Sequence, residues 1–294
     1  MSLALPLELD LSGDGRTVHP YYVLDVFTGS ALEGNQLGVF DGRPFSEGEM
    51  QRIARELNVS ETIFVLPPEQ GGTARIRIFT PTVELPFAGH PVLGGAIAVG
   101  QALALDEVVL ETKLTNAPVR LERDGGRIVS GWMEQRVPPI ELYARAGEVL
   151  AALGLERSLL PVEGYLNGPL HVFVAVESEE ALAALRPDFG ALLDHPNLGV
   201  NCFAGAGASW KLRMFGPPLG MNEDPATGSA AGPLALHLAR HGWTEFGREI
   251  EIRQGAEILR PSLLRARADG SADNVERILV GGSAVVVARG ELRL

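Results

Sequence analysis

Four polar residues of the sequence are candidates for acid/base chemistry, and Glu61 is the first of them along the chain. It precedes the apolar run 62–66, which is typical of a strand, so its carboxylate is expected at the mouth of that strand. A carboxylate at a cleft can take a proton from carbon and return it elsewhere, which is general acid/base catalysis without a metal. A solvated carboxylate in a loop is an equally good interpretation from position alone.

The other three candidates are His90, Asp224 and Ser229, which lie at or just before the expected start of a helix. We expect the helix dipole to keep the His90 ring neutral near pH 7, so that it can donate or accept a proton. Each residue also has a purely structural interpretation. His90 can simply pack at a helix start, Asp224 can cap a helix before Pro225, and the Ser229 hydroxyl can satisfy free backbone amides.

An internal repeat relates the two halves of the chain. The segment RIRIFTP at 75–81 recurs as KLRMFGP at 211–217, and ELPFAGH at 84–90 matches EDPATGS at 223–229. Each copy is followed by a run of small and apolar residues that is typical of a buried helix. A strand, a proline-bearing loop and a glycine-initiated helix in each half indicate a duplicated domain.

The repeat places His90 and Ser229 at matching positions, each at the start of one helix. If the two halves face each other, both helix starts point into one cleft. Free backbone N–H groups and the positive ends of the helix dipoles favour an anion there. The sequence therefore predicts a substrate that carries a carboxylate.

Smaller patterns predict the elements that position these residues. Ser46 and Glu49 form a capping box for a helix from about 46 to 57. Apolar alternation and turn residues predict strands over 21–26, 34–40, 61–66 and 74–79. The helices after the repeats, 91–99 and 230–239, are apolar nearly all round, so a sheet is expected to wrap around each.

The composition fits a strand-rich α+β protein of two domains. Apolar residues make up 46% of the 294 positions and aromatic residues 6%, and 35 glycines with 20 prolines imply many short elements. A formal net charge of −12 opposes binding to nucleic acid or to anionic membranes. Neither a signal peptide nor a membrane-spanning stretch is evident, so a cytoplasmic protein is expected.

Metal and cofactor motifs are not evident in the sequence. His237 and His241 have a spacing that can hold a metal, but Leu238 stands where a zinc protease has glutamate. With no third ligand evident nearby, we expect an exposed helix end there. Cys202, the only cysteine, is expected to be a small buried hydrophobe. The glycine-rich segments lack the spacing of a dinucleotide-binding motif, so no cofactor is expected. Ser229 does not lie in the G-x-S-x-G motif of a nucleophile elbow, so a serine hydrolase is only weakly supported.

At these residues the sequence resembles the PhzF family of phenazine-biosynthesis isomerases, which share the fold of diaminopimelate epimerase. The broad family signature lies in LEGN at 32–35, SET at 60–62, GHP at 89–91 and DPATG at 224–228. More specific segments are NGPLHVFV at 167–174, NCFAGAG at 201–207 and SAAGPLA at 229–235. The resemblance runs from about Tyr21 to the C-terminus. It departs at Gln36, which replaces the proline that usually follows the family's Gly-Asn.

The resemblance implies a cofactor-independent isomerase that converts trans-2,3-dihydro-3-hydroxyanthranilate to an aminoketone in phenazine biosynthesis, by moving a ring proton from C3 to C1. It implies that Glu61 shuttles the proton, that His90 and Asp224 assist, and that Ser229 and Gly228, with Gly89 at the matching helix start, bind the small cyclic amino-carboxylate substrate. Two cysteines at the helix starts, common in racemases of this fold, are absent here. Two alternatives stay open: an isomerase or epimerase of another small amino or hydroxy acid, and a non-catalytic small-molecule-binding protein of this fold.

The resemblance also implies a fold of two pseudo-symmetric diaminopimelate epimerase-like domains, each a mixed β-sheet barrel around a central helix. We place the first domain at residues 1–130, including an extension over 1–17, and the second at 131–283. The last strand, within 284–294, can cross back to the first domain. A homodimer is expected.

Overall fold

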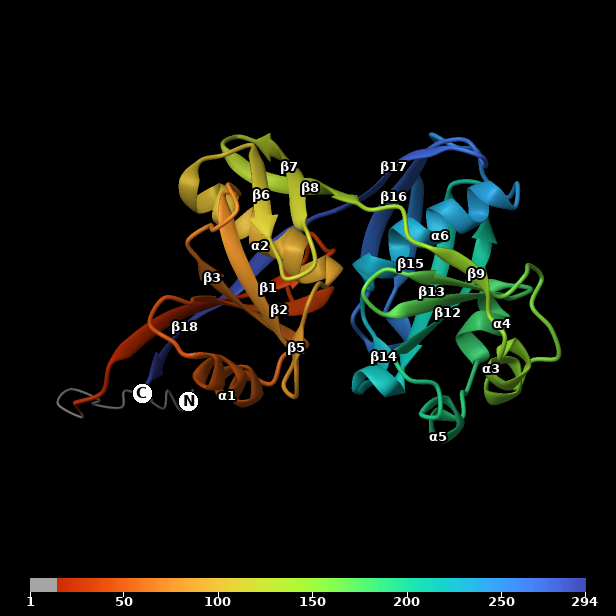
Figure 1. The fold of residues 1–294 in the computed structure, drawn as a ribbon, viewed down its shortest axis with the longest axis horizontal. Coiled ribbons are helices and arrows are strands. Elements are labelled where there is room, and N and C mark those ends of the chain that lie inside the picture. Colours follow the sequence, from red (N-terminus) through yellow and green to blue (C-terminus); the bar gives the residue numbers. More distant parts are fainter. Residues whose placement is uncertain (1–14) are drawn as a thin grey trace, which may run out of the picture.

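The computed structural model describes residues 15–294, which form two lobes side by side (Figure 1). The first lobe contains β1 (Val18–Val26), β2 (Asn35–Asp41), α1 (Glu47–Leu57), β3 (Glu61–Leu66), β4 (Ala74–Phe79), β5 (Glu84–Leu85), α2 (Gly89–Leu103), β6 (Glu107–Glu111), β7 (Asn116–Asp124) and β8 (Arg127–Gln135). The second contains β9 (Ile140–Leu142), α3 (Ala146–Ala152), β10 (Glu163–Leu166), β11 (Leu170–Ala175), α4 (Glu179–Ala184), α5 (Phe189–Leu192), β12 (Leu198–Ala206), β13 (Ser209–Gly216), β14 (Met221–Asp224), α6 (Gly228–Arg240), β15 (Ile250–Gln254), β16 (Ser262–Gly270) and β17 (Val275–Gly282). The last strand is β18 (Ala284–Arg293).

The two lobes repeat one topology, as the sequence predicts. In the first, β2 and β3 are parallel, β4 runs antiparallel to β3 and β5, and β6 is parallel to β4. In the second, β11 to β15 repeat this order of directions strand for strand. Even side-chain contacts recur, because Arg77 pairs with Glu84 at 2.6 Å and Arg213 with Glu223 at 2.8 Å. The predicted duplication is confirmed.

A buried helix occupies the middle of each lobe (Figure 1). Helix α2 packs against β1, β2, β6, β7 and β8, and α6 packs against β11, β16 and β17. All residues of α6 from Gly228 to Ala239 are buried, which fits its small and apolar sequence. Burial of each larger apolar side chain contributes about 1.5–3 kcal/mol, so packing inside the sheet rather than helix propensity holds these helices. The predicted α+β fold, a mixed sheet around a central helix in each lobe, is confirmed.

Local predictions from the sequence also hold. The capping box of α1 is present, with the Ser46 hydroxyl accepting from the Glu49 amide and the Glu49 carboxylate accepting from the Ser46 amide. Strands β3 and β4 begin and end at the predicted residues. The two central helices begin earlier than predicted, at Gly89 and Gly228. In α2 this start places Pro91 in the first turn, where a proline is tolerated.

The lobes are joined by strand pairing and by a clamp at Arg260. Strand β17 pairs antiparallel with β8, and β18 pairs antiparallel with β1 along its whole length. The Arg260 guanidinium reaches across to the first lobe, where it donates to Asp25 Oδ1 at 2.6 Å, to the Glu33 carbonyl at 2.5 Å and to the Gly34 carbonyl at 2.9 Å. Arg260 therefore ties the loop before β2 to the second lobe.

The proposed division between domains near residue 130 lies inside β8, which continues to Gln135. Of the proposed extension 1–17, residues 1–14 lie outside the described part, and Thr17 exchanges two backbone hydrogen bonds with Leu294. Among residues 15–294, no helix combines the length and the apolar character that a membrane crossing requires.

Candidate active site

A cavity of about 470 Å³ lies between the lobes and contains the predicted site. Its lining includes Glu61 from the start of β3, Asp224 from the end of β14, and the first turns of both central helices. Every residue predicted to act in catalysis or binding lines this one cavity: Glu61, Gly89, His90, Asp224, Gly228 and Ser229. Strand ends and helix starts, each fixed by a packed lobe, bring together residues far apart in the sequence.

The starts of α2 and α6 meet at Gly89 and Gly228. A Cβ added to Gly89 would lie 2.6 Å from the Ser229 backbone nitrogen, and one added to Gly228 would lie 2.9 Å from Phe27 Cζ. Any side chain at Gly89 would therefore force the two helix starts apart. Within the described residues, neither helix is capped by a side chain, so amides in both first turns are free for a ligand. Free amides at helix starts are groups that an anion can accept from.

Glu61 and His90 form a buried pair on the first-lobe side of the cavity. Glu61 Oε2 lies 3.0 Å from His90 Nε2, and the two side chains are 7% and 5% exposed. His90 Nε2 is also 3.3 Å from the Gln36 carbonyl, which only accepts, so Nε2 carries a proton. Apart from this pair with His90, Glu61 Oε2 has no hydrogen-bond partner among the described residues. A buried carboxylate oxygen with a free lone pair is a suitable acceptor for a proton from carbon.

The surroundings of His90 favour its protonated form, an effect that the sequence prediction of a neutral ring did not include. Burial by itself lowers the pKa of His90, but the charge of Glu61, its hydrogen bond, the charge of Asp224 and the Gln36 carbonyl outweigh it. The net effect raises the pKa above its ordinary value of 6.5. The nearby carboxylates thus outweigh the helix dipole on which the prediction relied. At this distance the His90 N–H donates to the Glu61 carboxylate.

Asp224 is held by side chains of both lobes rather than acting as a helix cap. Its Oδ1 accepts from Asn35 Nδ2 at 2.9 Å and its Oδ2 from Thr227 Oγ1 at 2.6 Å. Burial, followed by the charge of Glu61, raises the pKa of Asp224 to about 6. The simple capping interpretation is therefore wrong. Asn35, noted in the sequence only as part of a family signature, is a supporting residue of this site.

Ser229 lies on the second-lobe side and contacts a histidine that sequence reasoning did not single out. Its Oγ is 3.0 Å from His171 Nε2, and its backbone carbonyl accepts from Asn167 Nδ2 at 2.8 Å. His171 is on β11, is fully buried and lines the cavity. No spacing rule links positions 171 and 229; only the pairing of β11 within the lobe brings them together.

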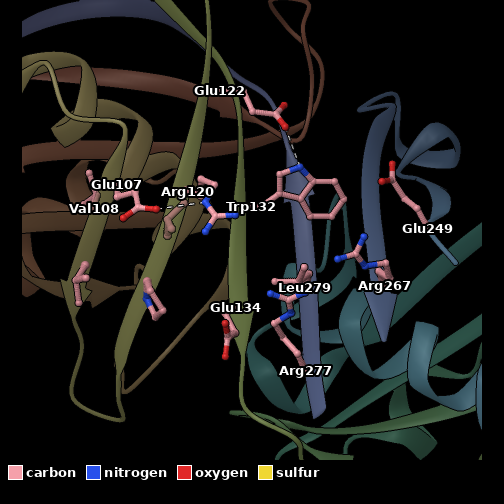
Figure 2. Close-up of a pocket in the computed structure, with 13 residues that line it drawn as sticks. Glu107, Val108, Arg120, Glu122, Trp132, Glu134, Glu249, Arg267, Arg277 and Leu279 are labelled. Atoms are coloured by element: carbon pink, nitrogen blue, oxygen red, sulfur yellow. Dashed lines mark hydrogen bonds and ion pairs between the residues drawn. The ribbon is translucent and has the colours of Figure 1, made fainter. Parts of the chain in front are cut away.

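A second cavity, of about 510 Å³, lies along β6, β7, β8 and β17 (Figure 2). Several of its charged side chains already have partners, such as Arg120 with Glu107 at 3.3 Å and Arg277 with Asp269 at 2.8 Å. Figure 2 shows these groups dispersed along the strands rather than converging on one point. Although this cavity is larger, it lacks a buried acid/base pair, so the chemistry belongs to the cavity at the helix starts.

The expectation of an exposed helix end at His237 and His241 is wrong for His237, which is fully buried. A third group is also close, because Glu163 Oε2 lies 3.3 Å from His237 Nδ1 and 3.0 Å from His241 Nε2. The same oxygen accepts from Arg240 at 2.7 Å and from the Tyr165 hydroxyl at 2.9 Å. The guanidinium supplies the positive charge that a metal would supply, so this group is a buried hydrogen-bond centre.

The buried-hydrophobe prediction for Cys202 holds. The thiol is fully buried, and burial raises its pKa far above the ordinary value. It lies in the apolar cluster under α4 and α5. A thiol in this environment is chemically inert.

Comparison with known proteins decides the family. The model of a family described as phenazine biosynthesis-like protein matches residues 24–290. The chain belongs to this family. Among curated members, the trans-2,3-dihydro-3-hydroxyanthranilate isomerase of Pseudomonas aeruginosa is 53% identical over 94% of this chain and 100% of that protein.

Solved structures of the phenazine biosynthesis-like family and of epimerases share the fold. A Bacillus anthracis phenazine biosynthesis protein of the PhzF family superposes with a TM-score of 0.80, at 25% identity, over 94% of this chain and 99% of that one. A hydroxyproline epimerase from Agrobacterium vitis superposes with a TM-score of 0.66, at 12% identity, over 95% of this chain and 92% of that one. The second likeness concerns the fold alone.

Proposed function

We propose that this protein is an isomerase that converts trans-2,3-dihydro-3-hydroxyanthranilate to an aminoketone, the reaction of phenazine biosynthesis implied by its full-length similarity to the Pseudomonas enzyme. The observation that carries the proposal is the buried Glu61–His90 pair at a cavity whose other side is formed by two uncapped helix starts. The substrate offers the matching pair of groups, a carboxylate and an acidic ring C–H.

In the proposed reaction, Glu61 takes the proton from C3 of the ring. The electron pair of the broken C–H bond moves through the conjugated double bonds to C1, which takes the proton back from the Glu61 carboxylic acid. The resulting enol then tautomerises to the ketone. The proposed reaction consists of proton transfers and therefore requires no oxidant, reductant or cofactor. His90 orients the Glu61 carboxylate through their 3.0 Å contact, and the charge of Asp224 contributes to raising the pKa of His90.

The helix starts supply the binding part of the proposal. Free amides of the first turns of α2 and α6 and the Ser229 hydroxyl surround the place for the substrate carboxylate. Gly89 and Gly228 have no side chain to obstruct the anion. Holding the carboxylate there fixes the ring over Glu61, which converts the proton transfer into an intramolecular step.

The direct test is NMR of purified protein with trans-2,3-dihydro-3-hydroxyanthranilate in deuterated water. We expect loss of the C3 proton signal and appearance of the aminoketone. A folded protein that leaves the substrate unchanged relative to an enzyme-free sample would refute the assignment and favour a different small acid as substrate.

The Glu61→Gln variant tests the proton shuttle. The amide has nearly the same shape but cannot accept a proton, so turnover should fall by at least about 10³-fold, while substrate still binds. Calorimetry measures the binding and NMR the turnover. Full activity in this variant would remove Glu61 from the mechanism.

We also propose a homodimer, as the family resemblance implies. Among the described strands, β18 pairs only with β1, which leaves one edge open, and Val286 on it is 62% exposed. Light scattering during gel filtration should give a mass near twice the 31.4 kDa of one chain. A mass of one chain at micromolar concentration would contradict the dimer.

A further inference from the structure

Ser229 and two buried side chains behind it, His171 and Asn201, form a line that leads away from the cavity. Asn201 on β12 lies with its Nδ2 3.3 Å from His171 Nδ1, and the other ring nitrogen of His171 lies 3.0 Å from Ser229 Oγ. Asn201 and His171 are both fully buried. The direction of the hydrogen bonds along this line decides what the Ser229 hydroxyl can offer a ligand.

The neighbours of Asn201 determine which atom of its side-chain amide faces His171. Its Nδ2 lies 3.0 Å from the Gly199 carbonyl and 3.3 Å from the Val172 carbonyl, and carbonyl oxygens only accept. The amide therefore presents its donor side to His171. Because this amide nitrogen cannot accept a hydrogen bond, a proton on Nδ1 of His171 would have no acceptor there, so Nδ1 is the unprotonated nitrogen of the ring.

The position of the proton on the His171 ring in turn determines the direction of its hydrogen bond with Ser229. Burial lowers the pKa of His171 to about 3, so the ring is neutral at all working pH values. A neutral ring with a bare Nδ1 carries its proton on Nε2, which then donates to Ser229 Oγ. The hydroxyl has no other hydrogen-bond partner among the described side chains, so its own proton is free to turn into the cavity that Ser229 lines.

We propose that His171, oriented by Asn201, is a positioning residue that fixes the Ser229 hydroxyl as a hydrogen-bond donor to the substrate carboxylate. The arrangement is the reverse of a nucleophilic serine, whose histidine accepts the hydroxyl proton. It gives the two matching helix starts separate tasks: His90 faces the proton shuttle, while Ser229 binds the anion. The inference rests on the proposed function for the identity of the anion.

The first test separates positioning from folding by a double-mutant cycle. The His171→Leu variant should raise KM, and the Kd of the stable probe 3-hydroxyanthranilate, by about 10-fold or more with kcat little changed, because the lost contact serves binding. Ser229→Ala should have a similar effect, and the double variant should be no worse than either alone. His171→Gln, whose amide can donate from a similar place, should recover part of the loss. Additive losses in the double variant would overturn the inference.

A matched control is available in His195, another buried histidine, which does not line this cavity and contacts the Tyr143 hydroxyl at 2.7 Å. His195→Leu should lower thermal stability without changing KM or the Kd of the probe. An equal rise in KM in this variant would show that the His171 effect is only structural.

The second test reads the proton position directly. Nitrogen-15 NMR of labelled protein should show His171 as the Nε2–H tautomer, with shifts that do not change between about pH 5 and about pH 9. A proton on Nδ1, or titration in this range, would overturn the inference. Both this measurement and probe binding proceed without turnover. A protein that fails to isomerise the substrate but shows this tautomer and coupling would refute the proposed function alone.

Discussion

At the scale of single residues, the site depends on two carboxyl groups and an imidazole that are buried close together at the cavity. Asp224, Glu61 and His90 lie within one electrostatic network, in which the carboxylates raise the pKa of the ring and Glu61 raises that of Asp224. Sequence position identified each of these residues as a candidate, because Glu61 stands at a strand start and His90 and Asp224 lie in the repeated segments that lead into a helix. Their charge states could not be predicted, because those depend on distances across the cleft.

The Asp224→Asn variant should make the protein more stable at neutral and alkaline pH. The folded state raises the pKa of Asp224 from 3.8 to about 6, so the fold favours the protonated form. That contribution is fully present below about pH 4 and is lost as pH rises through about 6, where ionising the buried carboxyl costs free energy. The neutral amide avoids this cost, so we expect a gain of about 1–3 kcal/mol near pH 8.

Chemical denaturation of both proteins at about pH 4 and about pH 8 checks the sign. The stability difference should be small at the lower pH and favour the variant at the higher pH. The opposite trend would show that Asp224 is stabilised as the carboxylate by Asn35 and Thr227. Activity should fall in the variant, as expected where function requires a destabilised residue.

At the scale of elements, the sequence predicted correctly those structures that are decided by residues close together in the chain. The capping box of α1 and the alternation in β3 and β4 gave their residues correctly, because neighbours in sequence decide these structures. His171 could not be found as a site residue, because its contact with Ser229 arises only when β11 pairs within the second lobe. The burial of His237 was missed for the same reason, since its partners come from β10.

The meeting of the two helix starts gives a prediction at this scale. Gly89→Ala would place a methyl group 2.6 Å from the Ser229 nitrogen, and a backbone atom cannot rotate away. The starts of α2 and α6 must then separate, so kcat/KM should fall by about 10²-fold or more, because the anion site depends on their close approach.

Kinetics and thermal melting check this expectation. The matched control is Gly147→Ala in α3, where an added methyl group meets nothing within 4 Å. That variant should keep its activity and its melting temperature. Unchanged kcat/KM in the Gly89 variant would show that contact between the helix starts is not required.

At the scale of the whole molecule, the cavity exists because two lobes of the same topology face each other, and each lobe supplies different side chains to it. The first lobe supplies Glu61 and His90, and the second supplies Asp224 and Ser229. The repeat in the sequence predicted this arrangement in outline. The cross-lobe bonds of Asn35 and Arg260 could not be predicted, because no repeat position or spacing links the residues they join.

The Arg260 clamp gives a prediction at this scale. Arg260→Met removes the partner of Asp25, whose side chain is only 1% exposed, and leaves an uncompensated buried charge. We expect a loss of about 3–5 kcal/mol of stability. Activity should fall as well, because the loop that Arg260 holds leads into Asn35 and so to Asp224.

Denaturation and kinetics measured together check both effects. Arg157 forms an exposed ion pair with Glu177 at 3.5 Å, so Arg157→Met is the control and should change stability by less than about 1 kcal/mol. Equal effects of the two substitutions would show that the clamp contributes no more than a surface pair.

The pairing of β18 with β1 joins the last residues of the chain to the first described strand. During synthesis, β1 leaves the ribosome long before β18 exists, so the sheet of the first lobe stays incomplete until that strand has been made. Contacts of such long sequence separation make folding slow. The strands and central helix of the second lobe end at Gly282, before β18 begins. In a newly made chain, the half that carries Glu61 and His90 is therefore the last to close.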